Sequence, residues 1–141
     1  MNFMIAVDTN ILVYAFDATD DARKHRARAV LDQQSSLAIP WQVANEFIAV
    51  ATRRGLAAAS AWALLDSFVS RNQLLLPSSS THDLAKDLHI NHQVAFWDAL
   101  LYASCIEHHV SLLLSEDVPG KAIPNLNISN PFAQRQGNDG T

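Results

Sequence analysis

Short apolar runs alternate with longer segments of mixed polarity along most of this chain. The runs are rich in Val, Ile and Leu and have no helical period, a pattern typical of strands buried inside a sheet. They predict strands at residues 3–7, 36–39, 73–77, 111–114 and 126–128, the last as an edge strand. The first run stops at Asp8-Thr9-Asn10, and apolar residues resume at once with Ile11. The first strand is therefore expected to lead directly into a helix.

The segments between these runs carry apolar residues at the spacing of one helix face. They predict helices at residues 11–16, 21–34, 41–53, 57–71, 78–92 and 96–108. Asp20 or Asp21 is suited to begin the second helix, because the side chain of an aspartate accepts hydrogen bonds from unpaired helix N–H groups, and the fifth helix opens with Ser78-Ser79-Ser80-Thr81. Strands separated by helices or helix pairs predict an α/β sandwich of three layers, with a central, mainly parallel sheet flanked by helices.

Length and composition agree with one compact folded unit. The chain has 141 residues, of which 49% are hydrophobic and 17% charged. We expect a single domain over residues 1–132 and a flexible polar tail over residues 133–141. No apolar run is long enough to span a membrane, and the N-terminal run lacks the basic residues of a signal peptide. The single cysteine, Cys105, excludes a disulfide within the chain, and we expect a cytoplasmic protein.

The net charge of −4 is unlike that of most nucleic-acid-binding proteins, which contact phosphates through Lys and Arg. The basic residues are nevertheless clustered. Arg23, Lys24 and Arg26 share one predicted helix, and Arg53 and Arg54 end another. Both clusters are candidate contacts to a nucleic-acid backbone, with a solvated helix face as the alternative interpretation.

Two aspartates directly follow predicted strands. Asp8 ends the first strand, and Asp117 lies just after the fourth, within Ser115-Glu116-Asp117. Ligands of open parallel sheets bind at the carboxyl ends of the strands, so both aspartates are candidates for a metal or phosphate site. The alternatives are that Asp8 or Asn10 caps the next helix and that Asp117 stabilises a turn.

Two further acids lie on predicted helices. Glu46 has mostly apolar neighbours one turn away and no cationic partner there, so it is either compensated at the site or exposed at the helix edge. Asp98 follows Phe96-Trp97, which places it in the first turn of its helix along a partly buried face. If these acids converge with the strand-end aspartates, their oxygen atoms suit Mg²⁺ or Mn²⁺ better than zinc.

Four short segments contain these acids in a fixed order, at residues 7–14, 45–47, 97–100 and 114–117. The ordered set resembles the PIN-domain ribonucleases. The closing segment, residues 127–132, is similar to the end of the VapC-type toxins within that family. Each motif alone has little specificity, but together they span nearly the whole chain. The resemblance implies that the predicted sandwich is PIN-like.

The resemblance also implies an Mg²⁺- or Mn²⁺-dependent endoribonuclease that leaves a 5′-phosphate and a 3′-hydroxyl. Its principal metal ligands would be Asp8 and Asp98, with Glu46 and Asp117 as further ligands or holders of coordinated water. The residues that would orient these carboxylates are Thr9, Asn10 and Ser115. The implied partners are an RNA substrate, a cognate antitoxin that covers the acids, and a second copy of the chain in a homodimer.

One position departs from the family pattern, because Asn45 precedes Glu46 where many relatives carry a small hydroxyl. Other functions stay open as alternatives: a solitary PIN-type RNA-processing nuclease, a non-catalytic RNA-binding module or an Mg²⁺-dependent signalling module. The signalling module is disfavoured because no lysine follows Asp117 before Lys121. A phosphatase with two acids spaced as Asp-x-Asp is disfavoured because Asn10 occupies the second acid's place.

Overall fold

The structure, a computed structural model, describes residues 4–16, 20–33 and 36–133. The strands are β1 (Ile5–Val7), β2 (Leu37–Pro40), β3 (Gln73–Leu75), β4 (Leu112–Leu114) and β5 (Asn127–Ser129). The helices are α1 (Thr9–Phe16), α2 (Asp21–Gln33), α3 (Trp41–Arg53), α4 (Ala58–Arg71), α5 (Ser79–Asn91) and α6 (Phe96–Glu107). Every predicted strand and helix is found, and no end is displaced by more than two residues. Of the predicted tail, only Ala133 lies within the described residues.

The five strands form one sheet in the order β3-β2-β1-β4-β5. Ala6 of β1 pairs with Ala38 of β2 on one side and with Leu113 of β4 on the other. All four strand pairs are parallel, which confirms the predicted sheet, and β5 is an edge strand as expected. The carboxyl ends of the strands therefore meet along one edge of the sheet.

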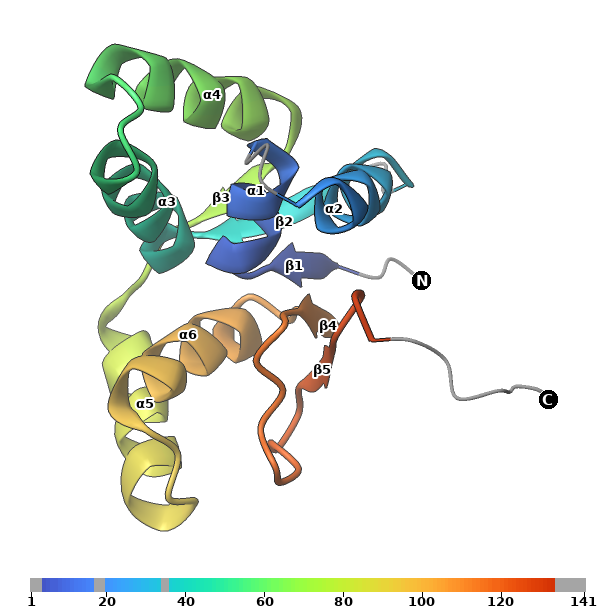
Figure 1. Ribbon diagram of the computed structural model, residues 1–141. Helices are drawn as coiled ribbons and strands as arrows, with labels where there is room; N and C mark the ends of the chain where they lie inside the picture. The colour runs from blue at the N-terminus through green and yellow to red at the C-terminus, as the bar shows by residue number, and fades with distance from the viewer. Residues whose placement is uncertain (1–3, 17–19, 34–35, 134–141) are drawn as a thin grey trace, which may run out of the picture.

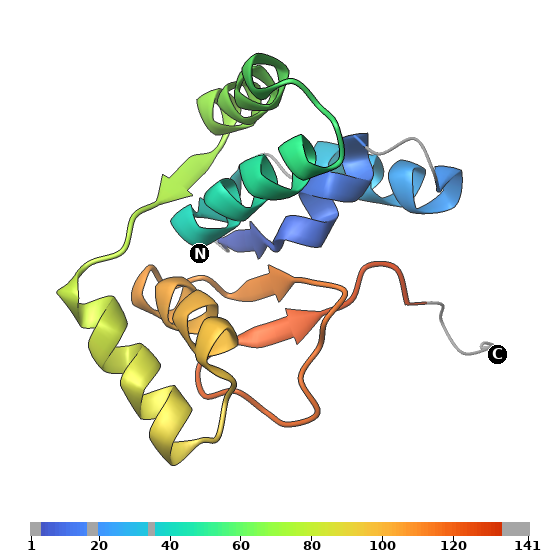
Figure 2. The ribbon, with the colours of Figure 1, turned by 60° about the vertical axis from the view of Figure 1, so that its left-hand side comes forward.

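Helices cover both faces of this sheet and complete the three predicted layers (Figure 1, Figure 2). Helices α1 to α4 lie on one side and connect β1 to β2 and β2 to β3. Helices α5 and α6 lie on the other side and bring the chain back to β4. Right-handed crossovers require this division, because the chain reverses its direction across the sheet after β3. No helix in the described ranges has the length and apolarity needed to cross a membrane.

Three phenylalanines join the helices of the larger layer. Phe16 of α1 makes edge-to-face contacts with Phe47 of α3 and Phe68 of α4, at centroid distances of 5.8 and 5.4 Å. In the other layer Cys105 of α6 is fully buried, and burial raises the pKa of its thiol to about 12. Cys105 is thus a packing residue of this layer, and its thiol stays protonated at neutral pH.

The side chains expected to begin two of the helices do so. Asp20 accepts a hydrogen bond from the Arg23 backbone N–H at 3.0 Å, at the start of α2. Ser78 and Thr81 form a capping box at the start of α5. Both hydroxyls also donate to Glu107 of α6, which lowers the pKa of that carboxyl. The start of α5 is therefore tied to the end of the helix that packs against it.

We expect Phe47→Ala to lower the free energy of unfolding by about 3–5 kcal/mol, because it leaves a cavity between α1, α3 and the sheet. Urea denaturation followed by far-ultraviolet circular dichroism measures the change. Leu76→Ala is the control, since Leu76 is 57% exposed. Its cost is expected to stay within about 0.5 kcal/mol. A loss below about 1 kcal/mol for Phe47→Ala would contradict the packing of this layer.

Candidate active site

The order of the strands reverses at β1. The chain leaves β1 towards β2 and β3 and later returns to β4 on the opposite side of β1. In an open α/β sheet such a reversal leaves a crevice at the carboxyl ends of the central strands, and ligands bind there. Asp8 follows β1, and its backbone N–H donates to the Leu114 carbonyl of β4 at 2.9 Å. The ends of the two central strands are thereby joined at this crevice.

Hydrogen bonds fix both oxygens of the Asp8 carboxylate. Oδ1 accepts from the Thr9 backbone N–H at 2.7 Å, and Oδ2 accepts from the Ser115 hydroxyl at 2.7 Å. The Ser115 hydroxyl in turn accepts from the backbone N–H of Asp117 at 3.0 Å. Asp8 thus contacts the first N–H of α1 and also lies at the end of β1. This bond is to the N–H of the next residue and not to one further into the helix, so it is not the helix cap that the alternative interpretation of Asp8 required.

The pKa of Asp8 reports the surroundings of this carboxyl. Burial raises the pKa above its ordinary value of 3.8, although the hydrogen bonds from Ser115 and Thr9 lower it. The negative charges of Asp117 and Asp98 raise the pKa further. Burial and like charge both favour the protonated form of a carboxyl group. Acids from the end of β1, the end of β4 and α6 therefore act on one another.

Glu46 joins this group from α3. Desolvation raises the pKa of its carboxyl, and the charges of Asp8 and Asp98 add to that effect. Side-chain contacts with Gln42 and Thr9 lower the pKa. Glu46 is exposed. Of the two interpretations that the sequence allowed, compensation at the site or exposure at the helix edge, the structure supports exposure. The partly desolvated carboxyl lies at the acid group and not inside the apolar core.

Asp98 lies in the first turn of α6, as predicted, but the residue is exposed rather than partly buried. The prediction was wrong because the apolar residues just before Asp98 are themselves exposed at the start of α6. Tyr102, one turn further along, is buried. Burial raises the pKa of Tyr102 to about 12, and the charges of Asp98, Asp8 and Asp117 contribute to the shift. Tyr102 therefore lies beneath the acids in its protonated form.

Glu116 has partners of its own in α1 and α2. The Tyr14 hydroxyl donates to Oε1 at 2.7 Å, and Arg23 forms an ion pair with Oε2 at 2.9 Å. The backbone N–H of Glu116 donates to Asn10 Oδ1 at 3.3 Å, so Asn10 binds this turn and does not cap α1. These contacts hold the turn that carries Asp117. Sequence analysis missed Tyr14, since no local pattern relates it to a residue so far along the chain.

Several of the five candidate RNA-binding residues interact within the protein. Arg23 pairs with Glu116, and Arg26 Nε donates to the Pro131 carbonyl at 2.8 Å. Arg54 at the end of α3 also has an interaction within the protein, and its charge acts on Tyr14. Lys24 lies on α2 and Arg53 on α3. RNA contact by any of the five stays a prediction.

The donor chemistry of the acid group suits a hard divalent cation. Carboxylate oxygens are the ligands that Mg²⁺ and Mn²⁺ prefer, and a cation would offset both the burial and the repulsion that raise the pKa of Asp8 and Glu46. In the described ranges, however, no three or more His, Cys, Asp or Glu side chains are grouped so that they could hold a metal ion. The fit of these residues to a cation is therefore one of donor chemistry, through their carboxylate oxygens.

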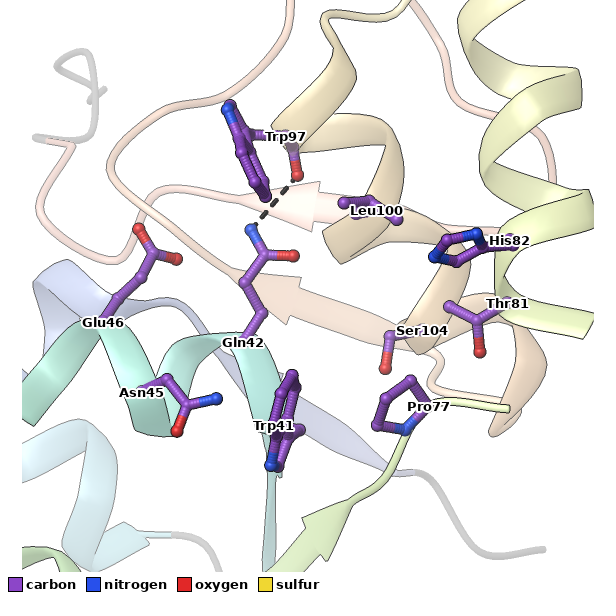
Figure 3. Close-up of a pocket in the computed structure, with 10 residues that line it drawn as sticks. All are labelled: Trp41, Gln42, Asn45, Glu46, Pro77, Thr81, His82, Trp97, Leu100 and Ser104. Atoms are coloured by element: carbon purple, nitrogen blue, oxygen red, sulfur yellow. Dashed lines mark hydrogen bonds between the residues drawn. The ribbon is translucent and has the colours of Figure 1, made fainter. Parts of the chain in front are cut away.

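A pocket of about 510 Å³ opens beside Glu46, between α3, α5 and α6 (Figure 3). Its size is typical of small-ligand sites. Gln42 Nε2 donates to the Trp97 carbonyl at 3.2 Å and links α3 to α6 at this pocket (Figure 3). The remaining lining residues are Trp41, Asn45, Pro77, Thr81, His82, Leu100 and Ser104. Sequence analysis did not identify the pocket, because its walls come from three helices.

A three-layer α/β fold with acids gathered at the reversal of its strand order defines the class of this protein. The family model described as the PIN domain matches residues 5–118, and the chain belongs to this family. The four candidate acids all lie within the matched segment. The family identified from the sequence motifs is thereby confirmed. No curated protein sequence matches the chain.

Several solved structures share this fold. VapBC2 from Rickettsia felis, bound to a DNA fragment from its promoter, matches with a TM-score of 0.69 and 21% identity over 91% of this chain and 98% of the other. DNA-bound VapBC from Salmonella typhimurium matches with a TM-score of 0.72 and 14% identity over 92% and 99%. VapC20 from Mycobacterium tuberculosis, a toxin that cleaves the sarcin–ricin loop, matches with a TM-score of 0.66 and 17% identity over 82% and 90%. At these identities the similarity establishes the fold.

We expect the difference in stability between Asp8→Asn and the wild type to depend on pH in the metal-free protein. Folding raises the pKa of Asp8 above 3.8. Below that value Asp8 is protonated in both the folded and the unfolded chain, so its charge does not lower the stability of the fold. As the pH rises through and above 3.8, the unfolded chain loses its proton more easily, and the wild type is progressively destabilised. The variant lacks this cost and gains stability relative to the wild type. Thermal melting in EDTA at a series of pH values measures the difference.

Asp66→Asn is the control for removing one negative charge, since Asp66 is exposed on α4. A stability difference for Asp8→Asn that does not change with pH, or that equals the difference for Asp66→Asn, would show that Asp8 is not destabilised by its surroundings.

Proposed function

We propose that this chain is a divalent-metal-dependent endoribonuclease that hydrolyses phosphodiester bonds in RNA. The observation that carries the proposal is the mutual influence of Asp8, Glu46, Asp98 and Asp117 at the end of the central strands. Acids held together in this way are costly to a fold unless something binds between them. A fold does not define an activity by itself, but a PIN fold with this acid group favours nuclease chemistry.

We assign Asp8 and Asp98 as the principal metal ligands, and Glu46 and Asp117 as further ligands or holders of water. When bound, Mg²⁺ or Mn²⁺ supplies an activated water near neutral pH and offsets the charge of the phosphate. Ser115 orients Asp8 through its hydrogen bond to Oδ2. The other residues assigned to orient the acids are Thr9 and Asn10, which bind Asp8 and the turn after β4 respectively.

Hydrolysis at this site needs no nucleophilic side chain. Water forms the new bond to phosphorus, the bond from phosphorus to O3′ breaks, and O3′ takes up a proton. The products are a 5′-phosphate and a 3′-hydroxyl. The only cysteine, Cys105, is buried with a raised pKa and is not available as an alternative nucleophile.

We further propose that the nuclease is the toxin of a type II toxin–antitoxin system, acting in the cytoplasm as a homodimer that a cognate antitoxin holds inactive. Support comes from the fold shared with VapBC of Rickettsia felis and Salmonella typhimurium, and with the RNA-cleaving toxin VapC20. A solitary RNA-processing nuclease would use the same acids. The two functions differ in whether a neighbouring gene encodes an inhibitor.

We expect the purified chain to cleave RNA in the presence of Mg²⁺ or Mn²⁺, and EDTA to stop the reaction. Ser115→Ala is expected to lower the rate roughly 10- to 100-fold, as is typical when a residue that orients a metal ligand is lost. Asp8→Asn and Asp98→Asn are expected to lower it further, because each removes a ligand charge. Cleavage of an end-labelled RNA, resolved on denaturing gels, measures the rates.

Asp66→Asn is the matched control and is expected to cleave as the wild type does, since Asp66 is exposed on α4 outside the acid group. Circular dichroism establishes that each variant is folded. Undiminished cleavage by folded Asp8→Asn or Asp98→Asn would refute the assignment of the acids.

We expect expression of the wild type in bacteria to arrest growth and expression of Asp8→Asn to leave growth unchanged, because RNA cleavage is the cause of toxicity. The reading frame directly upstream is expected to encode a small DNA-binding-like protein that restores growth and co-purifies with the chain. Normal growth on wild-type expression, together with no such neighbour, would favour the solitary nuclease.

A further inference from the structure

The turn of residues 115–117 serves the acid group with its first and last residues. Ser115 donates to Asp8 Oδ2 at 2.7 Å and accepts from the Asp117 backbone N–H at 3.0 Å. Asp117 is exposed, so packing around its side chain does not fix it, and its place depends on the backbone of the turn. The middle residue, Glu116, is the acid to which the proposed hydrolysis gives no task.

Glu116 binds two helices that precede it by about a hundred residues in the chain. Tyr14 of α1 donates to Oε1 at 2.7 Å, and Arg23 of α2 pairs with Oε2 at 2.9 Å. Burial raises the pKa of Tyr14, and the hydrogen bond to Glu116 raises it further, so the hydroxyl is a donor at neutral pH. The Arg23 side chain is 44% exposed, and an ion pair at such a position contributes little unless its geometry is held.

Two aromatic rings hold the Arg23 guanidinium at this carboxylate. Its central carbon lies 5.2 Å from the centroid of the Tyr14 ring and 6.0 Å from that of Phe132. The two rings pack edge to face at a centroid distance of 5.2 Å. Arg26 of α2 donates to the Pro131 carbonyl at 2.8 Å, which keeps the segment after β5 against the same helix. A stacked, planar guanidinium is pre-organised for its ion pair.

We propose that Tyr14, Arg23 and Phe132 are positioning residues that set the affinity of the acid group for a divalent cation. They act through Glu116, which fixes the turn and thereby the places of Ser115 and Asp117. Ligands that are already in place bind a metal more tightly than ligands that must first be ordered. The proposal rests on the nuclease function proposed above and deepens it, because it connects the segment after β5 to the metal site.

The test is the affinity of the purified chain for Mn²⁺ in the absence of RNA, measured by isothermal titration calorimetry. Tyr14→Phe removes the hydroxyl and leaves the ring and every charge in place. It is expected to raise the Kd for Mn²⁺ about 10-fold, the lower end of the range for residues that orient metal ligands. The Mn²⁺ concentration for half-maximal RNA cleavage is expected to rise by the same factor.

Two further variants also leave the charge unchanged. Arg23→Lys removes the planar fork, and Phe132→Ala removes a ring that holds it, so both are expected to weaken Mn²⁺ binding. Trp62→Ala is the control for the loss of an aromatic side chain, because Trp62 is 50% exposed on α4, away from the turn. It is expected to bind Mn²⁺ as the wild type does.

A double-mutant cycle shows whether Tyr14 acts through Glu116. Glu116→Ala alone is expected to weaken Mn²⁺ binding at least as much as Tyr14→Phe. Adding Tyr14→Phe to Glu116→Ala is expected to cause no further loss, because the hydroxyl then has no carboxylate to hold. Thermal melting in EDTA measures the stability of each variant separately. A lower melting temperature for Tyr14→Phe with unchanged Mn²⁺ affinity would show a purely structural role and refute the proposal.

Arg23 is also a predicted contact to RNA, and Arg23→Gln separates the two roles. In EDTA, which prevents cleavage, RNA affinity measured by fluorescence anisotropy at several salt concentrations reports direct contacts. Arg71→Gln is the matched control, since Arg71 is exposed at the end of α4. The positioning role predicts the same salt dependence for both variants. A slope smaller by about one for Arg23→Gln alone would make Arg23 a phosphate contact and remove it from the positioning residues.

Equal Mn²⁺ affinity for the wild type, Tyr14→Phe and Trp62→Ala overturns the proposal, as does a wild-type chain that binds no Mn²⁺. Failure of the nuclease function has a different signature. Mn²⁺ binding that depends on Tyr14 in a chain that cleaves no RNA keeps the positioning role and removes the nuclease. Cleavage with an Mn²⁺ affinity independent of Tyr14 removes the positioning role and leaves the nuclease.

Discussion

The hydrogen bond from the Ser115 hydroxyl to Asp8 Oδ2 joins the ends of β1 and β4, and the candidate site is arranged around it. The bond has a charged acceptor and lies where the carboxylate is largely removed from water, so it is among the stronger hydrogen bonds of a protein. It offsets part of the cost of burying Asp8 at a point where other acids repel it. The strand order makes the contact possible, because only parallel neighbours end at the same edge.

A site of this kind works against the stability of its own fold. Burial and like charge raise the pKa of Asp8 and Glu46, so the metal-free protein carries an electrostatic cost at neutral pH. The apolar packing of Phe16, Phe47 and Phe68 among α1, α3 and α4 has no such conflict. Phe47 directly follows Glu46 on α3, so one helix contributes both to the packed layer and to the acid group.

Adjacent residues in the acidic segments have different tasks. Ser115 orients Asp8, whereas the next residue, Glu116, binds Tyr14 and Arg23 and anchors the turn. On α6, Trp97 faces the pocket and the residue after it belongs to the acid group. Neighbouring side chains of a turn or helix point in different directions, so one short segment can serve the backbone, the acids and the pocket together.

The sequence by itself determined the helices and strands, the parallel sheet, the family and the candidate acids. The spacing of apolar residues and the capping residues are local features, and the order of the motifs is a property of the linear chain, so a single sequence shows all of them. Only the tertiary structure decided that Asp8 and not Asn10 contacts the start of α1, that Glu46 is exposed and that Tyr14 holds Glu116. The pocket also came from the tertiary structure, since α3, α5 and α6 each contribute to it. Contacts between residues as far apart as Tyr14 and Glu116 leave no periodic trace in a single sequence, and they exist only once the crossovers have brought the strand ends together.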